Sequence, residues 1–542
     1  MTSPVIDAGD GLPLTLPALW RRQVQDRADA LLMVCDDERL TYADADARSR
    51  CIAKGLIVAG AGKGTHVALL FPNGADFIVC MLAAARIGAV VLPLSTLSTA
   101  DELGWLLVNS DTNYLFATPR YRSQDFTAIL PRAIPGLDFA RPDQVRLANA
   151  PWLRHIWFAG SEGCGLHGDW SLAALEAMGQ GIDDALLEAV ELRVTPADRA
   201  VMIHTSGSTS KPKGVIHTHG ALIRHLDNIN QIRALTPNDV LFVTSPWFWV
   251  AGFAFGLLGT IVAGSRIVCS NAIEPARVLD LIERERPNMV NGYPPATVRY
   301  ANDPSFKRRD FSFIRRGNLF PIMPGDVRPR DPELRHNIYG MTEAGGALTM
   351  SGDESDQPEH RRGSLGLLLS GFEAKIVDPE TFEECGTGEV GELWIRSPFM
   401  MEGYYGRPRS EIFESDGWWR AGDMCRIDAD GFFYIAGRRG EMIKTSGANV
   451  APKEVEGVLR GLTGAAECIV LGLPDPERGE VVAGVVVDAQ FDEERIKQAA
   501  ANKLSRYKVP RRIIRLDQSE LPLLSSGKVD MQALKDLVRA RW

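Results

Sequence analysis

Residues 205–215 read TSGSTSKPKGV, and they directly follow a short apolar run at residues 200–203. Small side chains let backbone N–H groups approach an anion closely, while hydroxyl groups donate hydrogen bonds and lysines offset negative charge. This composition predicts a loop that binds a nucleoside triphosphate. It is not a Walker loop, because Pro212 and Gly214 stand where that motif requires Gly and Ser or Thr. Taken alone, such a run is more typical of a flexible linker, so the other motifs decide its meaning.

Four further motifs follow in the second half of the chain. They are NIYGMTE at 337–343, GWWRAGD at 417–423, GRRGEMIKTSGANVAP at 437–452 and SSGKV at 525–529. Together with the first loop they resemble the adenylate-forming superfamily, which contains acyl- and aryl-CoA synthetases, adenylation domains of peptide synthetases and firefly-type luciferases. The resemblance runs in family order from about residue 40 to the C-terminus, and it is strongest to an acyl- or aryl-CoA ligase.

The alternation of apolar runs and helical patterns indicates an α/β fold. Strand-like runs at 66–71, 90–94 and 114–117 enclose a helical pattern at 75–88, which predicts βαβ units and a mainly parallel sheet. From about residue 363 shorter Gly-rich runs predict β-hairpins or a small β-barrel-like subdomain. We therefore expect an N-terminal domain over 1–439 and a small α+β C-terminal domain over 440–542, which the resemblance makes a mobile lid.

The bulk composition excludes several function classes. The net charge of -9 and the pI near 5.6 give no general attraction to nucleic acid or to an anionic membrane. The eight cysteines are scattered, and the N-terminus lacks a secretory signal, so we expect a cytoplasmic protein. Residues 246–264 carry no charge, and we interpret them as a buried helix that lines a pocket rather than a membrane span. The oligomeric state stays open.

The resemblance implies ATP, Mg²⁺ and coenzyme A as cofactors and assigns the nucleotide contacts. Tyr339 would stack on adenine, Thr342 would hydrogen-bond the α-phosphate, and Asp423 would accept hydrogen bonds from the ribose hydroxyls, with Arg438 as a further ribose contact. Mg²⁺ would be held by Glu343 and Thr205. The triphosphate would lie on the loop residues Thr205, Ser206, Gly207, Ser208, Thr209 and Lys213. Without the companion motifs, Tyr339 and Glu343 would be interpreted as a buried aromatic and a solvated acid, and Asp423 as a turn cap.

The C-terminal motifs would complete the reaction. Lys528 would be the catalytic lysine, a compact charge that bridges the substrate carboxylate and the α-phosphate. Glu441 occupies the hinge position, where the family more often has Asp, and Gly447 lies on the face expected near the thiol of coenzyme A.

The chain departs from the family pattern at three places. Ser210 stands where the loop usually has Gly, and Ser tolerates positive φ poorly. The segment FPIMP at 320–324 lacks the expected Gly-Gly-Ala-Pro element, so adenine contacts there do not transfer. Leu523 and Leu524 replace the usual basic residue and Thr ahead of the Ser-Ser-Gly-Lys turn.

The acid pocket is expected in the uncharged stretch. Its large apolar residues predict a hydrophobic acid, either aromatic, alicyclic or of medium aliphatic length, although core packing is an equally good interpretation of each. An amino-acid substrate is disfavoured, because no Asp or Glu at 247–264 could pair with its ammonium group. The expected pocket residues are Trp247, Phe248, Trp249, Val250 and Phe253.

Three functions are compatible with these motifs. The first is ATP-dependent activation of a carboxylic acid to acyl-AMP, followed by transfer to coenzyme A. The second is a stand-alone adenylating enzyme that loads a carrier protein, or a luciferase-like oxygenase that uses the same first step. The third is a nucleotide-binding homologue that has lost catalysis; Ser210 favours it, whereas retention of Glu343, Asp423, Arg438 and Lys528 opposes it.

Overall fold

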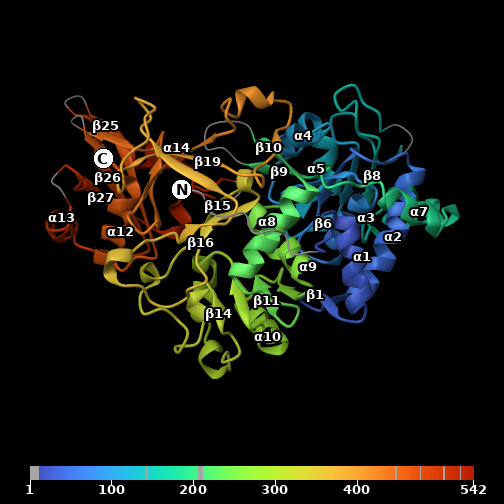
Figure 1. The fold of residues 1–542 in the computed structure, drawn as a ribbon, viewed down its shortest axis with the longest axis horizontal. Helices are drawn as coiled ribbons and strands as arrows, with labels where there is room; N and C mark the ends of the chain where they lie inside the picture. Colours follow the sequence, from blue (N-terminus) through green and yellow to red (C-terminus); the bar gives the residue numbers. More distant parts are fainter. Residues whose placement is uncertain are drawn as a thin grey trace.

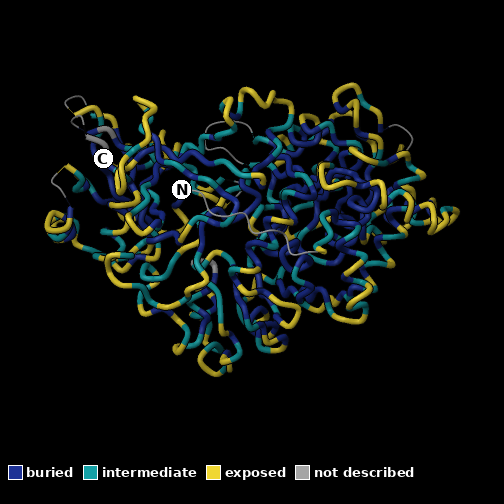
Figure 2. Tube along the Cα trace, in the orientation of Figure 1, coloured by how far each residue is buried: buried dark blue, intermediate teal, exposed yellow. Residues whose placement is uncertain are grey.

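The computed structural model describes residues 11–141, 145–205, 212–445, 448–475, 478–504, 507–524 and 527–542. In Figure 1 the N-terminal part of the chain, in blue, lies at the opposite end of the molecule from the C-terminal part, in red. Figure 2 shows buried segments running through both parts and exposed segments at the periphery. The motifs at 337–343, 417–423 and 437–452 belong to the yellow and orange segments, whereas the strands beside the phosphate loop are green and residues 527–529 belong to the red C-terminal part.

One sheet carries the strands on either side of the predicted phosphate loop. Its strand order is β20-β10-β9-β4-β3-β5-β8. From β8 to β9 neighbouring strands are parallel, which confirms the predicted βαβ pattern, whereas β10 is antiparallel to both β9 and β20. The bounds are β3 His66–Leu70, β4 Val90–Pro93, β5 Tyr114–Ala117, β8 His155–Phe158, β9 Arg199–Thr205, β10 Lys213–Thr218 and β20 Gly403–Tyr404.

Helices of the first two hundred residues connect and cover these strands. Helix α2 begins at a capping box, in which the Thr41 hydroxyl accepts from the Asp44 amide and the Asp44 carboxylate accepts from the Thr41 amide. The buried face of α3 is almost continuous, as expected for a helix between core layers. The bounds are α1 Leu16–Arg27, α2 Tyr42–Val58, α3 Ala75–Arg86, α4 Ala100–Asn109, α5 Phe126–Ala133, α6 Leu172–Met178 and α7 Asp184–Glu191, with the short strands β6 Arg120–Tyr121 and β7 Gln124–Asp125 beside α5.

A second sheet lies beside the first and has the order β14-β13-β11-β12-β1-β2. Its neighbouring strands are parallel except for the β1–β2 hairpin. The bounds are β1 Leu31–Cys35, β2 Glu38–Thr41, β11 Val240–Val243, β12 Arg266–Cys269, β13 Met289–Asn291 and β14 Arg316–Gly317, with helices α8 His219–Ile232, α10 Pro275–Glu285 and α11 Val298–Ala301. The carboxyl ends of β11 and β13 lead into the segments that line the cavity described below.

The uncharged stretch forms a π-helix, η3 Ala251–Leu258, followed by α9 Gly259–Ala263. Most of its residues are buried, as predicted for a core helix. A Cβ at Gly252 would lie 2.0 Å from the Pro246 carbonyl oxygen, so the tight start of this helix requires glycine. In the part of the chain that the structure describes, no helix combines the length and apolar character needed to cross a bilayer.

Antiparallel sheets follow from residue 339 onward. One has the order β15-β16-β17 and the other the order β18-β19-β21-β22. The second is the Gly-rich β-subdomain expected from the sequence. The bounds are β15 Tyr339–Met341, β16 Gly346–Met350, β17 Leu367–Leu368, β18 Glu373–Val377, β19 Gly391–Arg396, β21 Trp419–Ile427 and β22 Phe433–Arg438.

The last hundred residues form an α+β unit with its own hydrophobic packing. Cys468 and Val470 belong to one apolar cluster and Ile469 and Leu471 to another, because alternate side chains of a strand point to opposite faces of its sheet. Both clusters draw on residues from 443 onward, which is why we propose a boundary near residue 440. The bounds are β23 Ile443–Thr445, β24 Ala448–Val450, α12 Pro452–Thr463, β25 Glu467–Asp475, β26 Gly479–Val487, α13 Glu493–Ala501, β27 Arg512–Leu516 and α14 Met531–Ala540.

Candidate active site

The predicted phosphate loop joins two paired strands. Thr205 ends β9 and Lys213 begins β10, and these two residues are direct partners in the antiparallel ladder. The strand pairing therefore fixes both ends of the loop next to each other. Ser206, Gly207, Ser208 and Thr209, together with Ser210, lie outside the described residues.

The Thr342–Glu343 turn is held by three separate segments. The Nε2–H of His217, in β10, donates to the Thr342 carbonyl at 2.7 Å and so holds the backbone of the turn. The Met401 amide donates to the Glu343 carbonyl at 2.8 Å. The Tyr404 hydroxyl donates to Glu343 Oε1 at 2.8 Å. These contacts place the predicted α-phosphate and metal residues beside the strand that leaves the phosphate loop.

The tautomer of His217 follows from its burial. His217 is 0% exposed, and burial lowers its pKa to about 4, so the imidazole is neutral near pH 7. Because a carbonyl oxygen only accepts, Nε2 carries the proton. The motif analysis missed both His217 and Tyr404. His217 could have been found, because it lies four residues after Lys213 of the phosphate-loop motif. Tyr404 could not, because the pairing of β20 with β10 that brings it to this site is not visible in the sequence.

Tyr339, Asp423 and Arg438 form a cluster, as expected for residues that hold one nucleoside. The Tyr339 hydroxyl donates to Asp423 Oδ2, and Arg438 Nε lies 3.1 Å from Asp423 Oδ1. Asp423 and Arg438 are direct partners across β21 and β22. Burial, reinforced by the Asp423 charge, raises the pKa of Tyr339 far above its usual range, so the phenol stays protonated. The buried carboxylate is thus paired on both oxygens before any ligand arrives.

Lys528 reaches the same region from the C-terminal unit. It lines a cavity of about 700 Å³ together with Trp249, Gly340 and Met341. Burial lowers the pKa of Lys528, the positive charge of Arg438 adds to this effect, and the negative charge of Glu343 opposes it. The ammonium group is therefore within electrostatic reach of the groups predicted to hold the ribose and the metal. A Cβ at Gly527 would lie 4.0 Å from Trp249, so the turn before Lys528 packs against the cavity wall.

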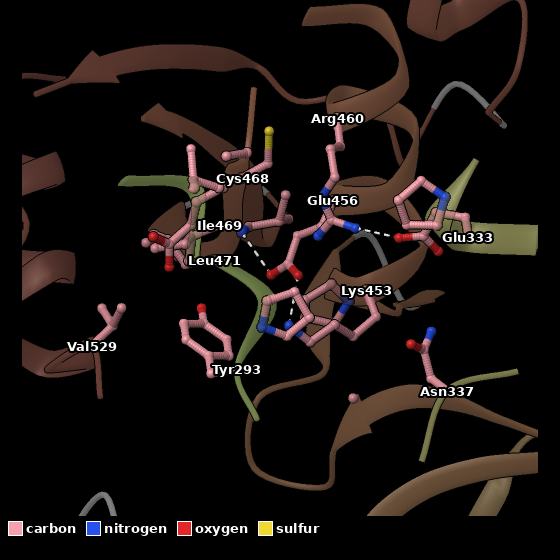
Figure 3. Close-up of a pocket in the computed structure, with 18 of the residues that line it drawn as sticks. Tyr293, Glu333, Asn337, Lys453, Glu456, Arg460, Cys468, Ile469, Leu471 and Val529 are labelled. Carbon is pink, nitrogen blue, oxygen red and sulfur yellow. Dashed lines mark hydrogen bonds and ion pairs between the residues drawn. The ribbon is translucent and has the colours of Figure 1, made fainter. Parts of the chain in front are cut away.

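The predicted hinge borders a second cavity between the two parts of the chain. Glu441 lies in a turn, where its amide donates to the Arg438 carbonyl at 2.9 Å, and it lines a cavity of about 860 Å³. Figure 3 shows this cavity, with Arg460 of α12 reaching Glu333 of the N-terminal part. The Arg460 Nη1 to Glu333 Oε1 distance is 2.6 Å, so this ion pair fastens the present arrangement. Gly447 lies outside the described residues.

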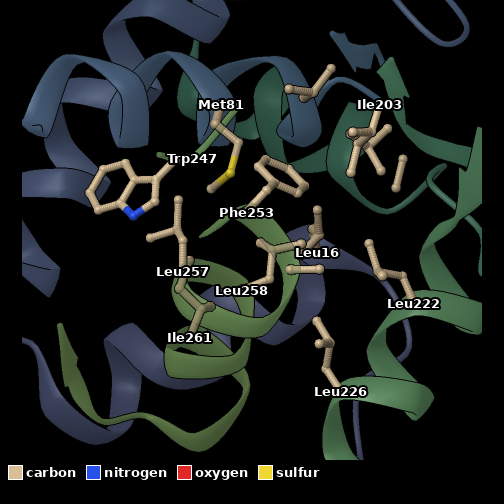
Figure 4. Packing of buried hydrophobic residues seen from close by; sticks show 14 of the residues in the cluster. Leu16, Met81, Ile203, Leu222, Leu226, Trp247, Phe253, Leu257, Leu258 and Ile261 are labelled. Atoms are coloured by element: carbon tan, nitrogen blue, oxygen red, sulfur yellow. The ribbon is translucent and has the colours of Figure 1, made fainter. Parts of the chain in front are cut away.

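The predicted acid-pocket residues divide into two groups. Trp249 and Val250 line the 700 Å³ cavity, and Phe248 packs edge-on against Trp249 at a ring distance of 5.4 Å. Trp247 and Phe253 instead lie in the hydrophobic core (Figure 4). Both of their rings contact Phe77. Neither is among the residues that line the cavity, so for these two the core-packing interpretation fits the structure better.

Several cavity residues were not predicted from the sequence. Phe255, Met341 and Ala347 add apolar wall, and Asn291 and Asn318 add polar groups. Asn318 is fully engaged, because it exchanges hydrogen bonds with the backbone of Gly292 at 2.9 and 3.0 Å. Asn291 is 8% exposed, and its Oδ1 has no hydrogen-bond partner among the described residues. The cavity lining is therefore mostly apolar, and its polar members include Lys528, Glu467 and Asn291, whose carboxamide oxygen has no partner among the described residues.

Comparison with known proteins agrees with this geometry. Residues 20–405 match the AMP-binding enzyme family, and residues 454–528 match the AMP-binding enzyme C-terminal domain. YngI of Bacillus subtilis is 31% identical with 94% of each chain covered, and a feruloyl-CoA synthase of Amycolatopsis is 32% identical with 93% of this chain and 94% of the relative covered. The ATP-bound crystal structure of MatB from Rhodopseudomonas palustris has a TM-score of 0.77 at 25% identity, with 96% of this chain and 98% of that chain covered. The chain therefore belongs to the AMP-binding enzyme family of adenylate-forming enzymes.

Proposed function

We propose that the protein is an AMP-forming acid–CoA ligase. In the first step a carboxylate oxygen attacks the α-phosphorus of ATP, which forms acyl-AMP and releases pyrophosphate. In the second step the thiol of coenzyme A attacks the acyl carbon, which forms the thioester and releases AMP with the thiol proton going to solvent. The observation that carries this proposal is the position of Lys528 in a cavity whose wall includes Trp249 and whose neighbours include Glu343 and Arg438.

The residues of the first step act by position and charge. Asp423 would accept hydrogen bonds from the ribose, beside Tyr339 and Arg438, because an ionised carboxylate can accept several. Thr342 would donate to the α-phosphate from a turn that His217 holds. Lys213 would offset charge at the base of the loop, and Lys528 would stabilise the charge that develops between carboxylate and phosphate.

The residues around Glu343 fit a magnesium ion bound together with the triphosphate. No group of three or more His, Cys, Asp or Glu that could hold a metal occurs among the described residues. Mg²⁺ does not need such a group, because it binds through one or two carboxylates plus phosphate oxygens and waters. Glu343 would supply the carboxylate, and Thr205 lies at the end of the loop strand. When bound, the ion would neutralise charge on the departing pyrophosphate.

The second step is proposed to use the C-terminal unit, residues 440–542, as a mobile lid that rotates about Glu441. Gly447 would then lie near the thiol of coenzyme A. The Arg460–Glu333 ion pair that joins the two parts is partly exposed and therefore weak, which supports such a rotation. A cytoplasmic location stays a prediction.

The substrate is proposed to be a hydrophobic carboxylic acid. The cavity has more apolar than polar lining, and Trp249 with Phe248 behind it narrows one side. No acidic residue at 247–264 could pair with the ammonium group of an amino acid, and Glu467, the acidic residue among those lining the cavity, comes from the C-terminal unit. The names of the relatives include both an aromatic feruloyl-CoA synthase and a long-chain fatty acid ligase, so an aromatic, alicyclic or aliphatic chain is compatible with the family.

The test is a panel of carboxylic acids supplied with ATP and Mg²⁺, with and without coenzyme A. Acid-dependent pyrophosphate release together with thioester formation supports the proposal. Release without a thioester would reject coenzyme A as acceptor, and would favour a carrier protein or an amine, since an amide bond synthetase shares this fold. No release across the panel would favour a nucleotide-binding protein without catalysis.

A further inference from the structure

Tyr404 contacts both Lys213 and Glu343, the two charged residues proposed to meet the triphosphate. It lies in β20, at the edge of the first sheet, where it is the ladder partner of Val215 in β10. Its hydroxyl donates to Glu343 Oε1 at 2.8 Å, and the Nζ of Lys213 lies 5.0 Å from the centre of its ring. One side chain therefore contacts the loop lysine with its ring and the acid with its hydroxyl.

The hydroxyl of Tyr404 acts as a fixed donor. A carboxylate oxygen only accepts, so the hydroxyl carries the proton of this hydrogen bond. The same short segment also holds the backbone, because the Met401 amide donates to the Glu343 carbonyl. Oε1 and the backbone carbonyl of Glu343 are thus both held, which restricts the orientation of the carboxylate.

The ring of Tyr404 keeps opposite charges apart. A lysine ammonium over an aromatic face gains electrostatic stabilisation without neutralising its charge. Among the ion pairs of the described residues, none joins Lys213 to Glu343; each contacts Tyr404 instead. A direct Lys213–Glu343 pair would cancel the charges that a magnesium triphosphate needs at this position.

We propose that Tyr404 is a positioning residue that aims Glu343 and Lys213 at the triphosphate and prevents their direct pairing. The inference rests on the proposed function, in which these two residues meet the triphosphate and its metal ion. It predicts an effect on the first step of the reaction and none on the second.

The neighbouring Tyr405 provides a matched control. Its hydroxyl donates to Asp111 Oδ2 at 2.6 Å, so it also bonds a carboxylate, but one outside the candidate site. We expect Tyr404→Phe to lower kcat for acid-dependent pyrophosphate release by about tenfold to a hundredfold, the loss typical of a hydrogen bond to a charged group. KM for the acid and thioester formation from supplied acyl-adenylate stay unchanged. Tyr405→Phe leaves all three unchanged.

A second pair of variants separates the ring from the hydroxyl. Tyr404→Leu removes both and lets Lys213 pair with Glu343, so we expect it to weaken ATP binding in the presence of Mg²⁺ more than Tyr404→Phe does. Calorimetric titration of the full chain with ATP, at low and at saturating Mg²⁺, measures this without turnover. Tyr405→Leu and the melting temperatures of all variants show how much of any loss is structural.

The outcomes distinguish this inference from the proposed function. If the wild type releases no pyrophosphate with any acid, both fail. If the wild type is active and Tyr404→Phe matches Tyr405→Phe in kcat and in Mg²⁺-dependent ATP binding, the positioning role alone is rejected. Equal losses in both half-reactions, or tighter Mg²⁺-dependent binding in Tyr404→Phe, also reject it.

Discussion

Replacing Lys528 with alanine tests whether its ammonium group acts in adenylate formation. The side chain enters the 700 Å³ cavity from the C-terminal unit, with Arg438 and Glu343 as its electrostatic neighbours. Burial and the Arg438 charge lower the pKa of Lys528, and the Glu343 charge opposes them. Loss of one such stabilising contact costs about 10²–10³ in rate, or roughly 3–4 kcal/mol. We expect Lys528→Ala to slow pyrophosphate release by that factor.

The assay measures the two half-reactions separately. Acid-dependent pyrophosphate release reports the first, and thioester formation from supplied acyl-adenylate and coenzyme A reports the second, which we expect to stay near the wild-type rate. Lys535→Ala is the control, because Lys535 lies on α14 of the same unit and lines the other cavity. Because the pKa of Lys528 is lowered, its ammonium group loses its proton at a lower pH than that of an ordinary lysine. Wild-type adenylate formation should therefore begin to decline at a correspondingly lower alkaline pH. Equal loss in both half-reactions, or equal effects of the two variants, would refute this reasoning.

Three further predictions concern stability and domain arrangement. His225 is 0% exposed and burial lowers its pKa to about 3, so below about pH 6.5 the unfolded chain binds more protons than the folded chain and stability falls on acidification. Between neutral pH and pH 5, the free energy of unfolding of His225→Phe should therefore fall by about 2 kcal/mol less than that of the wild type. Urea unfolding that gives the same pH dependence for both proteins would contradict this. Asn291→Leu should leave the free energy of unfolding unchanged or raise it by about 1 kcal/mol, because the carboxamide oxygen is already unpaired, whereas a large loss of stability would show that it has a partner. Glu333→Gln removes a partly exposed ion pair worth about 0–1 kcal/mol. The ratio of the adenylation rate to the rate of thioester formation should therefore fall by up to about fivefold. Parallel changes in both rates would exclude a role of this pair in the domain arrangement.

The fold and the grouping of the site motifs were largely predictable, because both depend on local patterns. Alternating runs predicted the parallel strands β3, β4 and β5, and the structure confirms them within a few residues. The motifs around Tyr339, Asp423 and Lys528 were found separately in the sequence, and the structure brings them into one region. Their catalytic roles stay predictions.

The remaining features depend on long-range pairing and on helix geometry. Tyr404 reaches Glu343 because β20 joins the edge of a sheet whose other strands come from the first 218 residues. Within the π-helix, Phe255 lines the cavity while Phe253 packs in the core. In the turn before it, Trp249 lines the cavity while Trp247 packs in the core. Composition alone could not separate the two.

The walls of the 700 Å³ cavity come mostly from residues 243–347, whereas Lys528 arrives on a unit with its own hydrophobic clusters. We therefore expect the choice of acid to depend mostly on residues 243–347, whereas the proposed catalytic lysine belongs to the C-terminal unit. A designer could remodel the contour around Trp249 and Asn291 to accept a new acid without disturbing the reactive lysine, and chimeras that exchange C-terminal units between relatives should keep the acid preference of the larger parent.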